Sequence, residues 1–480
     1  MHLRRKLGYI YEGGSEIFPL RSIKIIFRAE FLILLLSIFF LAGFSPAAHT
    51  AISDGTVELE FSLENGLRVY LLSQPRFSLA AAVLAVKAGV VNETPETSGL
   101  LHLLEHCLLF RQTHLLQENR LFNLLAEYGI HYNAFTEQDL MMFEISLPGE
   151  FLEKGLELLK EVVFNFNLTQ EELEKEKEVL LKELADVARR PEKVGLAKVY
   201  ELAFPDSGYG LPVYGNEAVV RKTELRSLQD FHRKLFRTDR AALAVAGNFK
   251  PEETAEKIKK LFSELMPPAE RQPEHPLRAK FATHGPEVHL KMKISETYVM
   301  VGFPAPEYSS ADRVAMDMLS EILGQGLNPL LFQAFSGQPD LITSARFHYL
   351  AHEGAGLALI SLTTEEDKVP AARRALVNFL PKLAEINYSS KDYLPSQQFL
   401  VFDYLQGGKN RFRWLSERMM ESPLTLAASL ARHLLLRDRN FQVDYLKAID
   451  RLSSSDLRKT ARKYFSGVKP VWVIVKPEEK

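Results

Sequence analysis

"SGLLHLLEHCLLF", residues 98–110, is an apolar segment that three ionisable residues interrupt: His102, Glu105 and His106. They stand at positions i, i+3 and i+4, so on an α-helix they form one stripe. Burying three such side chains together costs several kcal/mol unless a partner compensates them. Histidines at i and i+4 lie about 6 Å apart, and a zinc ion about 2 Å from each ring nitrogen fits between them. The segment therefore predicts a metal-binding helix.

Glu105 adjoins the predicted ion without having to bind it. A carboxylate in that place can take a proton from zinc-activated water and return it to a leaving amine, so Glu105 is the candidate general base of a peptidase. The alternative is that His102 and His106 are buried core residues that bind no metal, with Glu105 as their hydrogen-bonding partner.

A catalytic zinc ion has three protein ligands, so a third must come from another segment. The best source is "TQEELEKEKEVLLKELADV", residues 169–187, which Thr169 and Glu172 begin with a capping box. Glu176 and Glu183 lie seven residues apart on one face of this helix, and leucines flank Glu183. From spacing alone, this run of charges favours a solvated acidic helix, which is what such runs usually are.

Composition excludes several other classes of protein. The net charge is −2 and no basic run is present, so nothing predicts nucleic-acid binding. Cys107 is the only cysteine in the 480 residues, so no internal disulfide can form and packed cores must stabilise the chain. A lone cysteine in an apolar helix is typical of a small buried side chain.

The N-terminus predicts export. Basic residues precede an apolar run, Phe31 to Phe44, and small residues follow it, which is the order of a secretory signal peptide. The run is shorter than the roughly 17–25 residues that a membrane-spanning helix needs. We therefore expect residues 1–50 to be a signal segment and the protein to lie in a bacterial periplasm. An uncleaved segment anchoring the chain to a membrane is the alternative.

The rest of the chain predicts an internal duplication. Residues 233–253 and 462–479 both contain the end of a helix, a turn, an apolar strand and then Lys-Pro-Glu-Glu. The prolines and polar residues of 266–287 are typical of a linker. We therefore expect a metal-bearing domain at 51–265 and a homologous metal-free domain at 288–480, each of α/β type. Within the first domain we expect a hairpin at 57–74 and strands at 80–90 and 139–147. We also expect helices there, at 98–111, 117–128, 150–165 and 170–188.

With these motifs the chain resembles the inverted-zincin peptidases of the pitrilysin and insulinase family, of which H-x-x-E-H is the signature. Further segments resemble that family in order over about residues 57–260. They are "YGIHYNAFTEQD" (128–139), "EKEVLLKE" (176–183), "AFPDSGYGLPVYGNEAVV" (203–220) and "FHRKLFRTDRAALAVAGNF" (231–249).

The resemblance implies a role for each matching residue. It implies one zinc ion per chain, held by His102, His106 and Glu183, with Glu105 as general base and Glu176 as a carboxylate that orients the site. The implied fold is α+β, with two homologous α/β domains whose antiparallel-rich sheets are covered by helices and which enclose a chamber.

The resemblance also implies where substrate binds. Asn133, Ala134 and Phe135 would lie on an edge strand to which an extended peptide adds as a further strand. Taken alone, "NAFT" is an ordinary strand segment.

The second half departs from the family in one respect. Family members that work alone carry an Arg and a Tyr seven residues apart, where this chain has Ser336 and Thr343. Arg346 and Tyr349 are only three apart and are a poor substitute. A preorganised donor of this kind is worth roughly 10²–10³ in rate. We therefore expect the chain to be the zinc subunit of a heterodimer with a metal-free homologue that supplies the Arg and Tyr.

The expected function is that of an exported zinc endopeptidase acting on unfolded polypeptides or short peptides. A non-catalytic assembly or core subunit of the same family is the alternative, although such subunits usually lack the metal motif. A processing enzyme for one dedicated precursor is a third reading.

Overall fold

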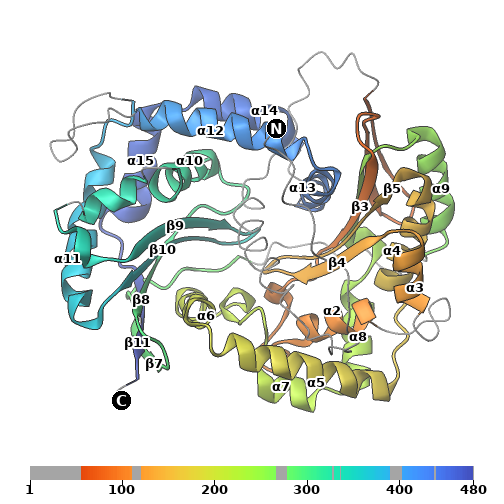
Figure 1. Cartoon of the computed structure of the whole chain (residues 1–480), viewed down its shortest axis with the longest axis horizontal. Coiled ribbons are helices and arrows are strands. Elements are labelled where there is room, and N and C mark those ends of the chain that lie inside the picture. The colour runs from red at the N-terminus through yellow and green to blue at the C-terminus, as the bar shows by residue number, and fades with distance from the viewer. Residues whose placement is uncertain are drawn as a thin grey trace, which may run out of the picture. The chain divides into compact units, whose positions relative to one another are not determined.

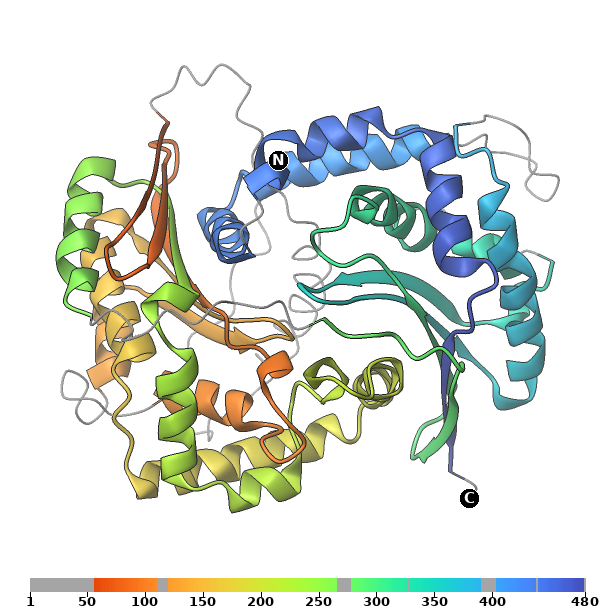
Figure 2. The same cartoon turned by 180° about the vertical axis from the view of Figure 1, so that it is seen from behind.

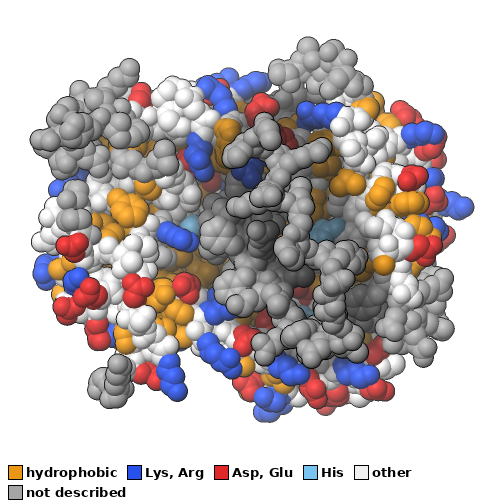
Figure 3. All heavy atoms as spheres, viewed as in Figure 1, with side chains coloured by type: hydrophobic (Ala, Val, Ile, Leu, Met, Phe, Trp, Pro, Cys, Tyr) orange, Lys and Arg blue, Asp and Glu red, His pale blue; other side chains and the backbone are white. Residues whose placement is uncertain are grey.

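The structure is a computed structural model that describes residues 56–110, 120–265, 278–326, 329–335, 337–389, 403–436 and 439–478. The expected export segment, residues 1–50, lies outside these ranges, as do Ser336 and most of the expected linker. Among the described residues, no helix is both long and apolar enough to cross a membrane. On the face shown in Figure 3, acidic and basic side chains are interspersed over the described residues, in keeping with a net charge near zero.

The first half of the chain forms a mixed sheet of six strands in the order β1-β2-β6-β3-β5-β4. Its strands are β1 (Val57–Ser62), β2 (Arg68–Ser73), β3 (Leu79–Val86), β4 (His131–Thr136), β5 (Met141–Pro148) and β6 (Ala241–Gly247). Among the described strands of this sheet, only β2 and β6 pair in parallel. The expected hairpin at 57–74 is confirmed: its turn contains Gly66, whose φ of +94° favours glycine.

The second half forms a five-stranded sheet in the order β7-β11-β8-β10-β9. Its strands are β7 (Glu287–Met292), β8 (Thr297–Pro304), β9 (Ser344–Ala351), β10 (Gly356–Thr364) and β11 (Val471–Pro477). Strand β11 is parallel to β7 and antiparallel to β8, just as β6 is parallel to β2 and antiparallel to β3. Five strands thus repeat one topology, which confirms the duplication and the prediction of two similar α/β domains.

Helices cover the sheets of both halves (Figures 1 and 2). Those of the first half are α2 (Leu100–Phe110), α3 (Arg120–Glu127), α4 (Leu152–Phe164), α5 (Gln170–Val187), α6 (Pro191–Ala203), α7 (Glu217–Lys222), α8 (Leu225–Leu235) and α9 (Pro251–Ser263). Those of the second half are α10 (Arg313–Gly324), α11 (Val369–Phe379), α12 (Tyr404–Met419), α13 (Pro423–Leu436), α14 (Arg439–Arg451) and α15 (Ser454–Phe465).

The strand expected at 80–90 ends at Val86 because the chain turns there. Gly89 passes so close to the segment 138–140 that a Cβ atom on it would lie 2.2 Å from the carbonyl carbon of Asp139. A short 3-10 turn, Val90–Asn92, follows and leads toward α2. Leu84, Leu104 and Phe143 belong to the large apolar cluster formed by β3, α2 and β5, so α2 is embedded in the core of the first half.

Two helices pack on the sheet of the opposite half. Helix α6 packs against β8 and β11 of the second sheet, while α13 packs against β2, β3 and β6 of the first. Gly195 on α6 makes this possible, since a Cβ there would lie 2.6 Å from Met300 Sδ. A Cβ on Gly302 of β8 would likewise lie 2.8 Å from Val199 Cγ1. Helix packing therefore crosses the expected boundary between residues 265 and 288.

A buried polar cluster also joins the halves. The carboxylate of Asp139, which follows β4, accepts hydrogen bonds from the Tyr209 hydroxyl at 2.5 Å and the Glu353 backbone N–H at 3.1 Å. His352 Nδ1 lies 3.4 Å from the same carboxylate. Burial by itself raises the pKa of Asp139, but the bonds with His352 and Tyr209 outweigh it and hold the pKa below its ordinary value. The end of β4 is thereby fixed against the second half.

Candidate metal centre

Helix α2 carries the ionisable stripe, and a buried carboxylate fixes its N-terminus. Glu93 Oε2 accepts the backbone N–H of Gly99 at 3.0 Å, and Oε1 accepts that of Leu101 at 2.7 Å. Burial raises the pKa of Glu93 to about 7, although these backbone bonds oppose the shift. The first N–H groups of a helix have no partner within it, so Glu93 supplies one. The sequence does not predict this role of Glu93, because the residue belongs to no known capping motif.

Two glycines bring a distant loop against α2. Gly99 and Gly215 both have positive φ, +100° and +92°, and a Cβ on Gly215 would lie 2.3 Å from the Gly99 Cα atom. This close approach places the Tyr214 carbonyl oxygen 3.1 Å from His102 Nδ1, which donates to it. The hydrogen bond fixes the orientation of the His102 ring and leaves Nε2 to face the candidate metal position. The loop belongs to the segment 203–220, which resembles the family, but nothing in the sequence predicts its contact with His102.

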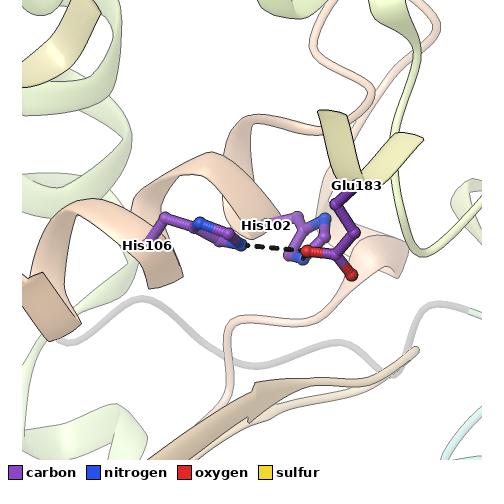
Figure 4. A group of neighbouring side chains, drawn as sticks. All are labelled: His102, His106 and Glu183. Carbon is purple, nitrogen blue, oxygen red and sulfur yellow. Dashed lines mark ion pairs between the residues drawn. The ribbon is translucent and has the colours of Figure 1, made fainter. Parts of the chain in front are cut away.

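The structure brings His102, His106 and Glu183 together from two helices (Figure 4). Glu183 Oε2, on α5, lies 3.4 Å from His106 Nε2 and 3.7 Å from His102 Nε2. One donor atom from each of the three lies within 4.8 Å of the others. Ligand atoms at about 2.0–2.2 Å around a tetrahedral zinc ion are separated by about 3.3–3.6 Å, so this donor set fits such an ion with small adjustments.

Helix α5, which carries Glu183, begins where the sequence predicts. It begins at Gln170 with the expected capping box, in which Thr169 Oγ1 accepts the Glu172 N–H and the Glu172 carboxylate accepts the Thr169 N–H. Glu176, two turns before Glu183, also faces α2: its Oε2 lies 3.7 Å from His106 Nδ1. A carboxylate at that distance can orient the imidazole.

The electrostatics describe a site that holds one proton when no metal is bound. Burial lowers the pKa of His102 to about 4. Burial also disfavours the charged form of His106, but the carboxylates of Glu176 and Glu183, 3.7 and 3.4 Å from its ring nitrogens, prevail and raise its pKa to about 9. A divalent cation can replace that proton, because it supplies positive charge to the same carboxylates.

Glu105 lies beside this group and is held by a strand residue. Thr136 Oγ1, at the end of β4, donates to Glu105 Oε2 at 2.7 Å. Burial raises the pKa of Glu105 to about 7, although the Thr136 bond and the His106 charge lower it. A carboxyl group with such a pKa can both accept and release a proton near neutral pH. Thr136 falls within the quoted "NAFT" segment, but its contact with Glu105 was not predicted.

The residues expected to bind substrate lie on β4, at the edge of the first sheet. Among the described strands, β4 pairs only with β5. Ala134 is buried, and Asn133 Nδ2 donates to Glu144 Oε1 on β5 at 3.2 Å. Phe135 is partly exposed. The edge position is the one that strand addition requires.

The positions that depart from the family pattern make local contacts in the second half. Thr343 Oγ1 donates to Glu296 Oε1 at 2.8 Å on the surface. The buried Tyr349 hydroxyl donates to the Pro306 carbonyl at 2.6 Å and is thereby used within its own half. Cys107 is buried in the apolar cluster around α2, as expected.

Comparison with known proteins gives two family matches. Residues 68–217 match the family described as insulinase (peptidase family M16), and residues 223–393 match the peptidase M16 inactive domain. The zinc protease PqqE of Helicobacter pylori is 25% identical over 429 residues, which cover 87% of this chain and 92% of that protein. An uncharacterized zinc protease of Rickettsia bellii is 23% identical over 405 residues, covering 84% of this chain and 94% of that protein.

Solved structures share the fold. The crystal structure of a protease from Helicobacter pylori superimposes with a TM-score of 0.78 at 22% identity, covering 88% of this chain and all of the other. That of a peptidase M16 inactive domain from Pseudomonas fluorescens gives a TM-score of 0.76 at 16% identity, with 88% of this chain and 98% of the other covered. The family matches confirm the resemblance inferred from the sequence motifs, and the solved structures show the same fold.

Proposed function

This chain belongs to the insulinase family of peptidases (peptidase family M16), and from that premise we propose that it is a zinc endopeptidase acting on unfolded polypeptides or short peptides. The observation that carries the proposal is the meeting of Glu183 with His102 and His106, with Glu105 held beside them. These residue types and spacings suit a divalent ion and a proton acceptor better than they suit a purely structural core.

The chain's own residues would divide the work as follows. His102, His106 and Glu183 would hold one zinc ion, which would supply Lewis acidity to the site. Glu105 accepts the proton of the attacking water and passes it to the leaving amine, and its bond with Thr136 fixes it for both transfers. The Tyr214 carbonyl and Glu176 orient the two imidazoles.

Substrate would bind along β4. A peptide added to this edge makes main-chain hydrogen bonds irrespective of its side chains, which suits an enzyme for unfolded chains. Since Thr136 ends the strand and donates to Glu105, a peptide lying beside Asn133, Ala134 and Phe135 is carried toward the general base.

Zinc stoichiometry and peptide cleavage test the proposal together. We expect one zinc ion per chain in the wild type and in Glu105→Gln, since Glu105 is not a ligand, and loss of cleavage in the variant. Cleavage that survives Glu105→Gln would refute the mechanism. A chain that binds no zinc would instead favour the non-catalytic assembly subunit.

We further propose that full activity requires a metal-free homologue as partner. Support comes from Thr343, which stands where family members that work alone carry a Tyr and which bonds to Glu296 instead. Mixing the purified chain with such a homologue should raise kcat by about 10²–10³. Full activity of the chain alone would contradict this part.

Export into a bacterial periplasm is proposed from the N-terminal sequence alone. Cell fractionation and N-terminal sequencing of the mature protein test it. Recovery of the chain from the cytosol with residues 1–50 intact would contradict it, and recovery from the membrane fraction would support the uncleaved anchor instead.

A further inference from the structure

We propose that Lys193 and Tyr214 form an anion-binding subsite beside the candidate metal centre, selecting peptides that carry a carboxylate near the scissile bond. The inference rests on the proposed peptidase function and adds a substrate class to it. It comes from a pair of partly exposed side chains that neither the fold nor the proposed mechanism uses.

The pair adjoins the metal ligands. Tyr214 is the residue whose carbonyl accepts from His102, and its ring lies edge-on to the His102 ring with 5.6 Å between centroids. Lys193 Nζ donates to the Tyr214 hydroxyl at 2.7 Å and lies 4.5 Å from the centroid of that ring. The ammonium is close enough to act electrostatically on both His102 and Glu183. A ligand of the pair would therefore lie within reach of the metal position.

Both side chains keep donors available. An ammonium has three N–H groups, of which the bond to Tyr214 uses one. The Tyr214 hydroxyl accepts that bond, so its own hydrogen remains to be donated. Within the described ranges, Lys193 makes no ion pair at 4 Å or less and the Tyr214 hydroxyl makes no further hydrogen bond. An ammonium and a hydroxyl side by side, both partly exposed, match the two oxygens of a carboxylate.

The position of Lys193 in its helix is electrostatically unfavourable. It lies in the first turn of α6, where the helix dipole disfavours a positive charge. On the same helix Lys198 pairs with Glu201 at 2.6 Å, whereas Lys193 has no carboxylate within 4 Å among the described residues. If Glu183 binds zinc, the ion already compensates the negative charge of the Glu183 carboxylate. Lys193 is then a cation whose natural partner is an arriving anion.

The distance between the pair and the metal position limits how far from the scissile bond the substrate's carboxylate can lie. The ammonium lies 4.5 Å from the centroid of the Tyr214 ring, and that centroid lies 5.6 Å from the centroid of the His102 ring. An extended peptide advances about 3.4 Å per residue, so a carboxylate within about three residues of the scissile bond can reach the pair. Two sources supply it: an Asp or Glu side chain, or the free C-terminus of a short peptide.

The experiment compares matched peptides on matched variants. One series places Glu or Gln within three residues of a known cleavage position, and a second ends in a free acid or an amide. Each is assayed for kcat/KM with the zinc-loaded protein and for Kd with the zinc-depleted protein. The variants are Lys193→Met, Lys193→Arg and Tyr214→Phe, with Lys198→Met as the control on the same helix.

We expect the wild type to prefer the carboxylate member of at least one series by about tenfold, the usual scale of a charge-assisted hydrogen bond. Lys193→Met should abolish the preference in both assays, Tyr214→Phe should reduce it, and Lys193→Arg should retain it. Lys198→Met should leave it unchanged. The series that shows the Lys193-dependent preference tells whether the pair binds an acidic side chain or a free C-terminus.

An equal preference in the wild type and in Lys193→Met would overturn the inference, as would a wild type that cleaves both members of each series equally. The peptidase proposal would survive either result. Conversely, a Lys193-dependent preference in the Kd of the zinc-depleted protein would uphold the subsite, and an absence of cleavage by the zinc-loaded chain mixed with its metal-free homologue would refute the peptidase.

Discussion

Replacing Thr136 by Val should shift the pH dependence of catalysis. Thr136 Oγ1 donates to Glu105 at 2.7 Å, and Glu105 is buried, so water cannot fully replace the lost donor. A hydrogen bond to a charged group contributes about 1.5–3 kcal/mol, and one pKa unit corresponds to about 1.4 kcal/mol. The bond stabilises the carboxylate form, so its removal raises the pKa of Glu105. The acid limb of the kcat/KM profile should therefore move to higher pH by about one to two units.

The assay is a pH–rate profile with a peptide lacking ionisable groups, on protein loaded with zinc. Thr136→Ser keeps the hydroxyl and serves as the control, and its profile should follow that of the wild type. Activity of Thr136→Val should recover toward wild type at high pH, because the base is then deprotonated in both. A profile that keeps its acid limb and falls uniformly would refute the reasoning, since it would show that Thr136 does not control the charge of Glu105.

Three further predictions concern metal binding and stability. Glu176→Gln should lower zinc affinity about 10–100-fold by releasing the His106 ring, measured by chelator competition, whereas Glu178→Gln on the exposed face of α5 should not. Zinc affinity of the wild type should fall about tenfold per pH unit below pH 9, because His106, with a pKa of about 9, must lose its proton to bind zinc. Calorimetry should detect the released proton. Asp139→Ala should cost about 3–5 kcal/mol in urea unfolding at neutral pH, since Tyr209 and other donors lose their buried acceptor. Because the pKa of Asp139 is lowered by folding, the wild type loses this advantage as pH falls through that pKa, and the two proteins should then converge in stability.

The exchange of α6 and α13 between the sheets affects how the protein can be dissected. Each half supplies a helix that buries apolar surface of the other sheet, as Tyr200 and Phe204 do with Met300 and Val473. A fragment cut at the expected linker would expose such surfaces on both pieces. Catalytic and binding assays are therefore best made on the whole chain.

Local patterns in the sequence determined the elements that carry the chemistry. The i, i+4 spacing of His102 and His106 fixes their common face by helix geometry alone. Asn65-Gly66 specified a hairpin, and Thr169 with Glu172 specified where α5 begins, because turns and caps depend on neighbouring residues. The repeated strand order of the two halves followed from a duplication that similar segments already indicated.

Tertiary structure decided which distant groups complete the centre. Spacing alone favoured a solvated helix for Glu183, and only the packing of α5 on α2 turns its carboxylate toward the imidazoles. Glu93, the Tyr214 carbonyl and Lys193 carry no periodic or capping signal. Their contacts depend on two glycines that permit a close approach of backbones and on a helix that packs on the opposite sheet. Such contacts join residues that are far apart in the chain, so their geometry is set by the packing of whole elements and no local pattern encodes it.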